Sequence, residues 1–171
     1  PVLVGAHIIT AVQSIVSRNV RPLDSAVISI CAVQAGDLGA MSVIPGEATL
    51  VGTVRTFSPA VQATVERRLN ELCTAVALGF GATARVTYER KYPATINTEP
   101  EAVFAGDVAE SLVGASRVVR DLEPSMGAED FSFMLQSKPG AYLRIGQGEV
   151  DSEGKGGMGS CFLHNSRYDF N

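Results

Sequence analysis

The chain has 171 residues, 46% of them hydrophobic, which is enough to bury the core of one domain or of two small ones. With 14 Lys and Arg against 18 Asp and Glu, it has no basic surplus to bind a nucleic-acid backbone. No apolar run approaches the roughly 20 residues of a membrane helix, and the three cysteines are odd in number and far apart, so we expect a cytoplasmic protein without a disulfide framework.

The first half of the chain predicts the element order αββαβ. Apolar residues at helical spacing predict a helix over residues 1–16. The runs AVISICAVQA and EATLVGTVRT, separated by a Pro-Gly turn, predict two strands. Ser58-Pro59 predicts the start of a second helix, and TARVTYERK alternates as a third strand. The apolar stripes expected in the two helices are Val4, Ile8, Val12 and Ile15, and Val61, Val65, Leu69, Leu72 and Val76.

This order predicts a two-layer α+β domain over residues 1–92, because two amphipathic helices can cover only one face of the sheet. One further strand before Pro1 would complete a βαββαβ plan, so we expect a ferredoxin-like domain whose first strand is missing. The tract YPATINTEPEA contains two prolines and predicts a boundary near Pro93, with a second part over residues 93–171.

The second part predicts two helices and a short strand. Thr98 and Glu101 have the spacing of a capping box, which predicts a helix to about Val113. SMGAEDFSFML indicates a helix start, AYLRIG a strand, and GQGEVDSEGKGGMGS a surface loop. That loop does not fit a phosphate-binding P-loop, because five residues separate Gly148 from Gly154 and a glycine follows Lys155.

Three places in the chain carry candidate functional groups, each with a plainer alternative. Gly127 would let a substrate approach the backbone while Glu129 or Asp130 orients a neighbouring group. Acidic residues at a helix start also suit the helix dipole, and the residues alone favour this plainer interpretation. Arg55, on the polar face of its strand, could hold a carboxylate, or it could be solvated or paired with a neighbouring Glu. His164, in LHNSRYDFN, could be a metal ligand oriented by its polar neighbours or a surface histidine. Its C-x-x-H pair with Cys161 cannot by itself close a zinc site.

Four tracts in the same order resemble the metal-dependent N-acyl-amino-acid amidohydrolases, the group that contains hippurate hydrolase and indole-acetyl-amino-acid hydrolase. LHNSRYDFN resembles the C-terminal LHNPRYDFND signature of that group. The tracts SMGAEDFSFML, VIPGEATLVGTVRTF and VQSIVSRNVRPLDSAV resemble other blocks of it. Ser166 stands where the group usually has proline, and Ser42 stands where many members have asparagine.

The resemblance implies a two-domain metallohydrolase. Its α/β zinc-peptidase-like catalytic domain would bind two divalent metal ions per subunit (zinc, manganese, cobalt or nickel). Its inserted ferredoxin-like lid would pair in a homodimer or higher homo-oligomer. Residues 1–92 would be most of the lid, and residues 93–171 the last part of the catalytic domain. His164 would be a metal ligand, whereas the other ligands and the glutamate that acts as general base would precede Pro1.

The implied substrate is an N-acyl amino acid, cleaved at its amide bond. Arg55, Gly127 and Glu129 are the candidates for substrate binding in this chain. Because one metal ligand cannot make a hydrolytic site, the chain by itself is expected to be inactive. The alternative is a non-catalytic module for dimerisation or for binding a small ligand.

Overall fold

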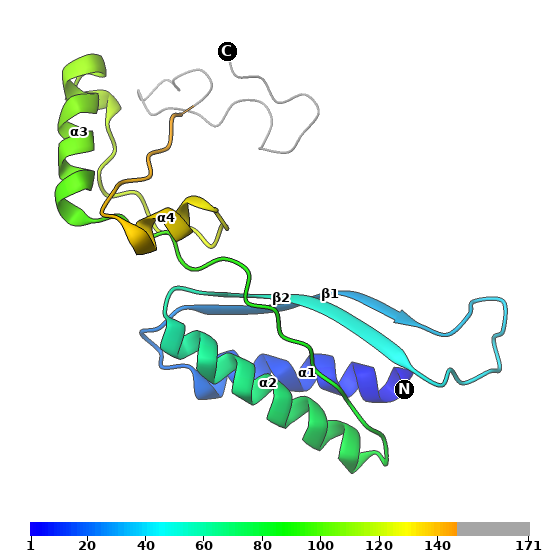
Figure 1. The fold of residues 1–171 in the computed structure, drawn as a ribbon. Coiled ribbons are helices and arrows are strands. Elements are labelled where there is room, and N and C mark those ends of the chain that lie inside the picture. Colours follow the sequence, from blue (N-terminus) through cyan, green and yellow to red (C-terminus); the bar gives the residue numbers. More distant parts are fainter. Residues whose placement is uncertain (147–171) are drawn as a thin grey trace. The chain divides into compact units, whose positions relative to one another are not determined.

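The computed structural model describes residues 1–146 of a chain that divides into two compact units, Pro1–Ala94 and Thr95–Asn171 (Figure 1). The first unit contains α1 (Val2–Asn19), β1 (Ala26–Ala35), β2 (Ala48–Thr56) and α2 (Pro59–Gly79). The described part of the second contains α3 (Glu99–Val113), the short 3-10 helix η1 (Ala115–Arg117) and α4 (Phe131–Ser137). No helix within residues 1–146 is long and apolar enough to cross a membrane.

Strands β1 and β2 form an antiparallel hairpin, and both helices of the first unit lie on the same side of it (Figure 1). Within residues 1–146 the sheet has these two strands. Arg55 lies opposite Val27, and the register shifts just after Ile30, which is opposite Gly52. A Cβ atom at Gly52 would overlap the carbonyl oxygen of Ser29, so this close approach of the two strands requires glycine.

The core of the first unit lies between the two helices and the hairpin. The predicted stripe of α1 is confirmed, since Ile8, Val12 and Ile15 are buried and Val4 packs against them. In α2 the predicted stripe also faces the core: Val61, Val65 and Leu69 are buried, and Leu72 and Val76 are partly buried and pack against them. The prediction missed Cys73 and Ala77, which are more deeply buried because burial continues in steps of four. The buried residues are Gly5, Ile8, Val12 and Ile15 in α1 and Val61, Val65, Leu69, Cys73 and Ala77 in α2.

The predicted third strand, residues 83–91, does not join the sheet. No strand pairing involves this segment in the part of the chain that the structure describes. Its side chains nevertheless alternate as predicted, because Ala84, Val86 and Tyr88 are half-buried against the core while Arg85 and Thr87 are exposed. Alternation thus predicted which side chains face the core, but a strand also needs a neighbouring backbone with which to pair.

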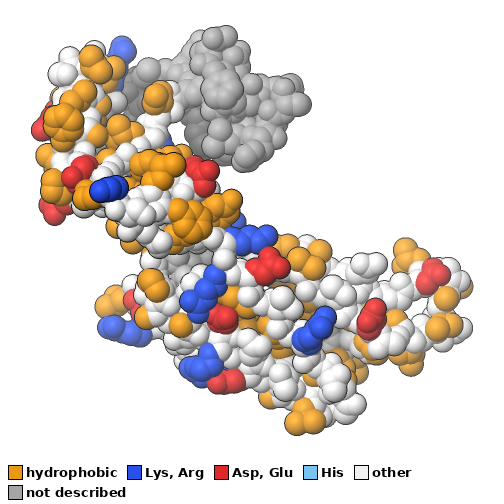
Figure 2. Space-filling view, viewed as in Figure 1, with side chains coloured by type: hydrophobic (Ala, Val, Ile, Leu, Met, Phe, Trp, Pro, Cys, Tyr) orange, Lys and Arg blue, Asp and Glu red, His pale blue; other side chains and the backbone are white. Residues whose placement is uncertain are grey.

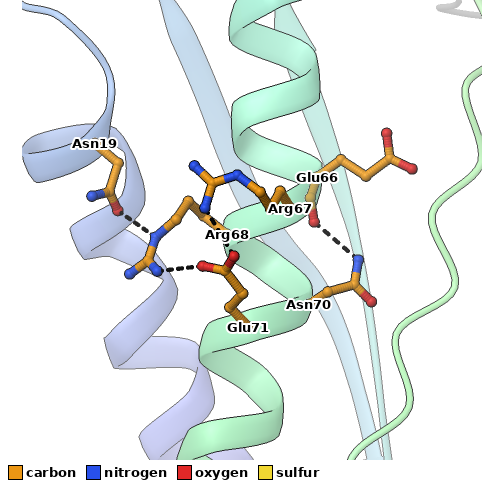
Figure 3. Close-up of polar contacts among 6 residues, drawn as sticks. All are labelled: Asn19, Glu66, Arg67, Arg68, Asn70 and Glu71. Atoms are coloured by element: carbon orange, nitrogen blue, oxygen red, sulfur yellow. Dashed lines mark hydrogen bonds and ion pairs between the residues drawn. The ribbon is translucent and has the colours of Figure 1, made fainter.

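A polar cluster ties the exposed side of α2 to the end of α1 (Figure 3). Arg68 donates a hydrogen bond of 3.1 Å to Asn19 Oδ1 and one of 2.5 Å to Glu71 Oε2, and Arg67 donates one of 2.8 Å to Glu71 Oε1. The hydrogen bonds from Arg67 and Arg68 hold the pKa of Glu71 below its ordinary value. Because these groups are solvent-accessible, each contact stabilises the fold only slightly.

Apolar side chains are exposed at the tip of the hairpin (Figure 2). Leu38 and Met41 are 99% and 96% exposed, and Val43 and Ile44 next to them are also exposed. Val33, further down β1, is 57% exposed. The sheet therefore has apolar side chains that the first unit does not cover.

In the second unit the predicted helix after Thr98 is present as α3, but the capping box is not. The Thr98 side chain forms no cap hydrogen bond to the helix, and Oε2 of Glu101 is buried without a hydrogen-bond partner among the described residues. The Thr98 hydroxyl instead accepts a hydrogen bond of 2.8 Å from the Gly140 amide. AYLRIG, predicted as a strand, has no assigned strand structure, although its first part lies against residues 97–98.

Arg120 holds the chain that follows η1 against α3. Its guanidinium donates to Glu110 Oε1 at 2.8 Å, to Asp107 Oδ1 at 2.6 Å and to the Val103 carbonyl at 3.3 Å. Gly106, buried on the same helix, leaves room for it, because a Cβ atom there would lie 2.5 Å from a guanidinium nitrogen. The turn after α3 is therefore closed by an ion pair that fits over a glycine.

Candidate functional site

The loop that precedes α4 carries Glu129, whose carboxylate accepts two hydrogen bonds. Tyr142 donates its hydroxyl to Glu129 Oε2 at 2.8 Å, and the Asp130 amide donates to Oε1 at 3.0 Å. The ring of Tyr142 also packs against that of Phe131, with the centroids 5.8 Å apart. Glu129 is half-buried, so its carboxylate is fixed in place but still accessible to solvent.

The contact between Tyr142 and Glu129 shifts the ionisation of both groups. The hydrogen bond from the Tyr142 hydroxyl, aided by the Asp130 contact, holds the pKa of Glu129 below its ordinary value. The Glu129 carboxylate in turn raises the pKa of the Tyr142 phenol. Near neutral pH Glu129 is therefore an ionised acceptor, suited to orient an N–H or hydroxyl group rather than to donate a proton.

Gly127 lies in the same loop and is exposed. A Cβ atom there would meet only Ser125 Oγ, at 3.8 Å, so the backbone at this point is open to an incoming group. Arg144 donates a hydrogen bond of 2.6 Å to Ser125 Oγ and so holds the loop on the other side of Gly127. Two of the sequence candidates, Gly127 and Glu129, are thus brought together in one loop.

Arg55 belongs to the first unit and lies on the face of β2 that points away from the helices. The neighbouring residue Val54 packs on the core, which puts Arg55 on the opposite face. It is half-buried, and its guanidinium forms no ion pair within residues 1–146. The structure therefore leaves a cation on the sheet face that could meet a carboxylate.

His164, the predicted metal ligand, lies outside the described residues. Within residues 1–146, no group of three or more His, Cys, Asp and Glu side chains is arranged to hold a metal ion. The described residues by themselves therefore do not fit a metal site.

Sequence reasoning missed the residues that hold the loop, namely Tyr142, Arg144 and Ser125. The tract AYLRIG, which predicts a short strand, places Tyr142 and Arg144 two residues apart. No local pattern connects them with Glu129 and Ser125, which lie 13 and 19 positions earlier in the chain.

The sequence pattern of peptidase family M20/M25/M40 matches residues 3–158, which cover both units. The chain belongs to this family. Its members are hydrolases and are generally metal-dependent. The resemblance found in the four sequence tracts is therefore confirmed at the level of the family.

Several characterised or solved proteins are similar to the chain. The hippurate hydrolase of Campylobacter jejuni is 33% identical over 171 residues, 100% of this chain and 42% of that protein. The N-acetyldiaminopimelate deacetylase of Bacillus licheniformis is 37% identical over 152 residues, 88% of this chain and 38% of that protein. The chain is also similar to a crystal structure named as that of a putative aminohydrolase from methicillin-resistant Staphylococcus aureus. The two structures superpose with a TM-score of 0.60 at 25% sequence identity, over 81% of this chain and 35% of that one. The chain spans less than half the length of these relatives.

Proposed function

We propose that this chain is part of a metal-dependent amidohydrolase that cleaves the amide bond of N-acyl amino acids of the hippurate type. The observation that carries the proposal is the family match over residues 3–158, together with relatives whose names include hippurate hydrolase and N-acetyldiaminopimelate deacetylase. Both of those names describe the removal of an acyl group from an amino-acid nitrogen.

Three residues are proposed to bind the substrate. Arg55 would hold the substrate carboxylate, because its guanidinium is free of ion pairs within residues 1–146 and has the planar donors that match a carboxylate. Gly127 would let the substrate lie against the backbone, and the ionised Glu129 would accept a hydrogen bond from it. The amide N–H of an N-acyl amino acid is a donor of the required kind.

The metal site is proposed to take His164 as one ligand of a pair of divalent ions such as zinc, manganese, cobalt or nickel. Its remaining ligands, and the general base, are proposed to come from other parts of the complete enzyme. Within residues 1–146, no group of three or more His, Cys, Asp and Glu side chains is arranged to hold a metal ion. When bound, such metal ions would supply Lewis-acid activation of the amide carbonyl and of water.

The first unit is proposed to be a ferredoxin-like lid over about residues 1–92 that pairs across a homodimer, and residues 93–171 to be the last part of the catalytic domain. Two features support the lid. Residues 83–91 have the side-chain alternation of a strand but pair with no strand within residues 1–146, so one more strand would complete the sheet. The hairpin also leaves apolar side chains uncovered.

Metal analysis alongside a hydrolysis assay tests this proposal. The 171-residue chain alone should keep no stoichiometric zinc through dialysis and should not hydrolyse hippurate, because metal affinity requires several ligands fixed together. In the complete enzyme, both properties should be present. His164→Ala should remove one metal ion or lower its occupancy there and leave the far-ultraviolet circular dichroism unchanged.

The matched control is His7→Ala, which removes the other histidine; His7 packs against Phe80, with the rings 4.7 Å apart. This variant should keep its metal content. A fully metallated and active His164→Ala enzyme would overturn the ligand assignment. A complete protein that binds N-acyl amino acids but neither holds metal nor hydrolyses them would favour a non-catalytic ligand-binding or dimerisation module.

A further inference from the structure

The segment Gly140–Arg144 is attached to the start of the second unit by a set of hydrogen bonds from two neighbouring residues. The Asn97 side chain contacts both backbone groups of Tyr142, donating to its carbonyl at 3.0 Å and accepting from its amide at 2.8 Å. The Thr98 amide donates to the Gly140 carbonyl at 2.9 Å, and the Thr98 hydroxyl accepts from the Gly140 amide at 2.8 Å. These bonds fix the register of the segment against residues 97–98.

The same segment reaches the candidate loop at two points. Tyr142 bonds Glu129 at 2.8 Å and Arg144 bonds Ser125 at 2.6 Å, so the two contacts lie on either side of Gly127. Both contacts come from side chains two positions apart, whose spacing along the chain is set by the backbone. The separation of the two loop ends therefore depends on the placement of one short segment.

Among residues 1–146, these two bonds are the long-range hydrogen bonds of the loop. Within residues 1–146, a Cβ atom at Gly127 would have only Ser125 Oγ within 4 Å, so packing by this part of the chain does not fix the loop there. An exposed loop without packing around its middle is ordinarily free to change shape. Its shape must then come from the bonds at its two ends.

We propose that Tyr142 and Arg144 are positioning residues that hold the loop 125–130 in the shape that binds substrate, and that Asn97 sets the placement of both. This inference rests on the proposed function, because it takes Gly127 and Glu129 to be substrate-binding residues. In binding terms, the segment pre-organises the loop, so that less ordering is needed when the substrate arrives.

The experiment compares Tyr142→Phe, Asn97→Ala, Arg144→Ala and the conservative Arg144→Lys. Tyr142→Phe removes only the hydroxyl and keeps the ring contact with Phe131. The matched control is Tyr88→Phe, which removes a hydroxyl from the first unit. Amide hydrogen exchange of residues 125–133 is measured on the 171-residue chain, and kcat and KM for hippurate are measured on the complete enzyme.

Tyr142→Phe, Asn97→Ala and Arg144→Ala should each exchange about ten-fold faster at the Asp130 and Ser132 amides, the factor expected for the loss of one hydrogen bond of ordinary net strength. They should also raise KM about five- to ten-fold while kcat stays within about two-fold, because positioning acts on binding. Arg144→Lys keeps a donor and should recover most of both effects, and the control should change neither.

Two results overturn the inference and separate it from the proposed function. Unchanged exchange in all three variants would show that the segment does not set the shape of the loop, whatever happens to KM. Faster exchange with unchanged KM would show that the loop is positioned but does not bind substrate, in which case the roles proposed for Gly127 and Glu129 are wrong. Raised KM with unchanged exchange would leave those roles standing and exclude positioning.

Discussion

The hydroxyl of Tyr142 lies 2.8 Å from Oε2 of Glu129 and donates a hydrogen bond to it, so the bond joins the segments that precede and follow α4 in the chain. The bond makes the pKa of Glu129 depend on a residue that lies 13 positions later in the chain. It has consequences for titration, for stability and for the way in which the loop is recognised.

Tyr142→Phe should change two titrations at once. The pKa of Glu129 should rise toward its ordinary value, since its main stabilising donor is lost, and one late-titrating phenol should disappear from the absorbance titration above about pH 10. Carboxyl-carbon chemical shifts and ultraviolet absorbance measure the two changes. An unaltered Glu129 titration would show that the hydrogen bond is not formed in solution.

The effect of Tyr142→Phe on the free energy of unfolding should depend on pH. Glu129 has a lowered pKa in the folded state, so its contribution is present above its unfolded pKa and is lost as pH falls through the folded value. Tyr142 has a raised pKa, so its contribution is present below its unfolded pKa and is lost as pH rises through the folded value. The stability difference between wild type and Tyr142→Phe should therefore be greatest near neutral pH and should shrink at both ends, as urea unfolding at several pH values would measure.

Arg55→Ala should weaken substrate binding without weakening the fold. Its side chain lies on the sheet face away from the core, so the free energy of unfolding should change by no more than about 0.5 kcal/mol. In the complete enzyme KM for a carboxylate-bearing substrate should rise about ten-fold, as expected for the loss of a charge-assisted contact. Arg21→Ala, an exposed cation of the same unit, is the control. A large loss of stability with unchanged KM would make Arg55 structural.

The chain should form a homodimer through the hairpin, because one edge of β1 is unpaired within residues 1–146 and the strand has exposed apolar side chains. Sedimentation equilibrium at micromolar concentration measures the mass. Val33→Lys, at a position of β1 that is 57% exposed, should shift the chain toward monomer, whereas Leu122→Lys, at a 59% exposed position of the second unit, should not. A wild-type chain that sediments as a clean monomer would count against the dimer.

Gly52→Ala should disturb the hairpin, because the added methyl group would overlap the Ser29 carbonyl and lie 3.2 Å from Ile30 Cδ1. We expect a loss of about 1–3 kcal/mol in the free energy of unfolding, as for other overpacked sites. Gly46→Ala is the control, since a Cβ atom there meets nothing within 4 Å, and it should change stability by less than about 0.5 kcal/mol. Equal stability of the two variants in chemical denaturation would contradict the close strand approach.

Sequence patterns predicted those parts of the fold that depend on local spacing. The stripe of α1 and the choice of face in β2 followed from helical and strand periods, because burial repeats with those periods. Residues 83–91 show the limit, since alternation predicts a buried face but does not provide a pairing partner. In α2, Leu72 and Val76 pack against the core as predicted, but Cys73 and Ala77, each one position further along, are more deeply buried, because packing and not the helical period alone sets the centre of the buried face.

The candidate site was predictable only in part. Gly127 and Glu129 were found because a glycine and a carboxylate precede a helix, which is a local signal. The contacts that define their surroundings come from Tyr142, Arg144 and Asn97, and these depend on how the chain returns after α4. Their polar character is visible in the sequence, but their partners are a property of tertiary structure. Thr98 shows the same limit, because its predicted cap was replaced by a contact with Gly140.

The fit of Arg120 over Gly106 links two positions that no sequence motif connects. A side chain larger than glycine at position 106 would displace the guanidinium, and Asp107 and Glu110 would then face each other on one helix without a shared cation. A substitution at position 106 should therefore be accompanied by a substitution at position 120. Related sequences should keep glycine with arginine, or should replace both in the same lineage.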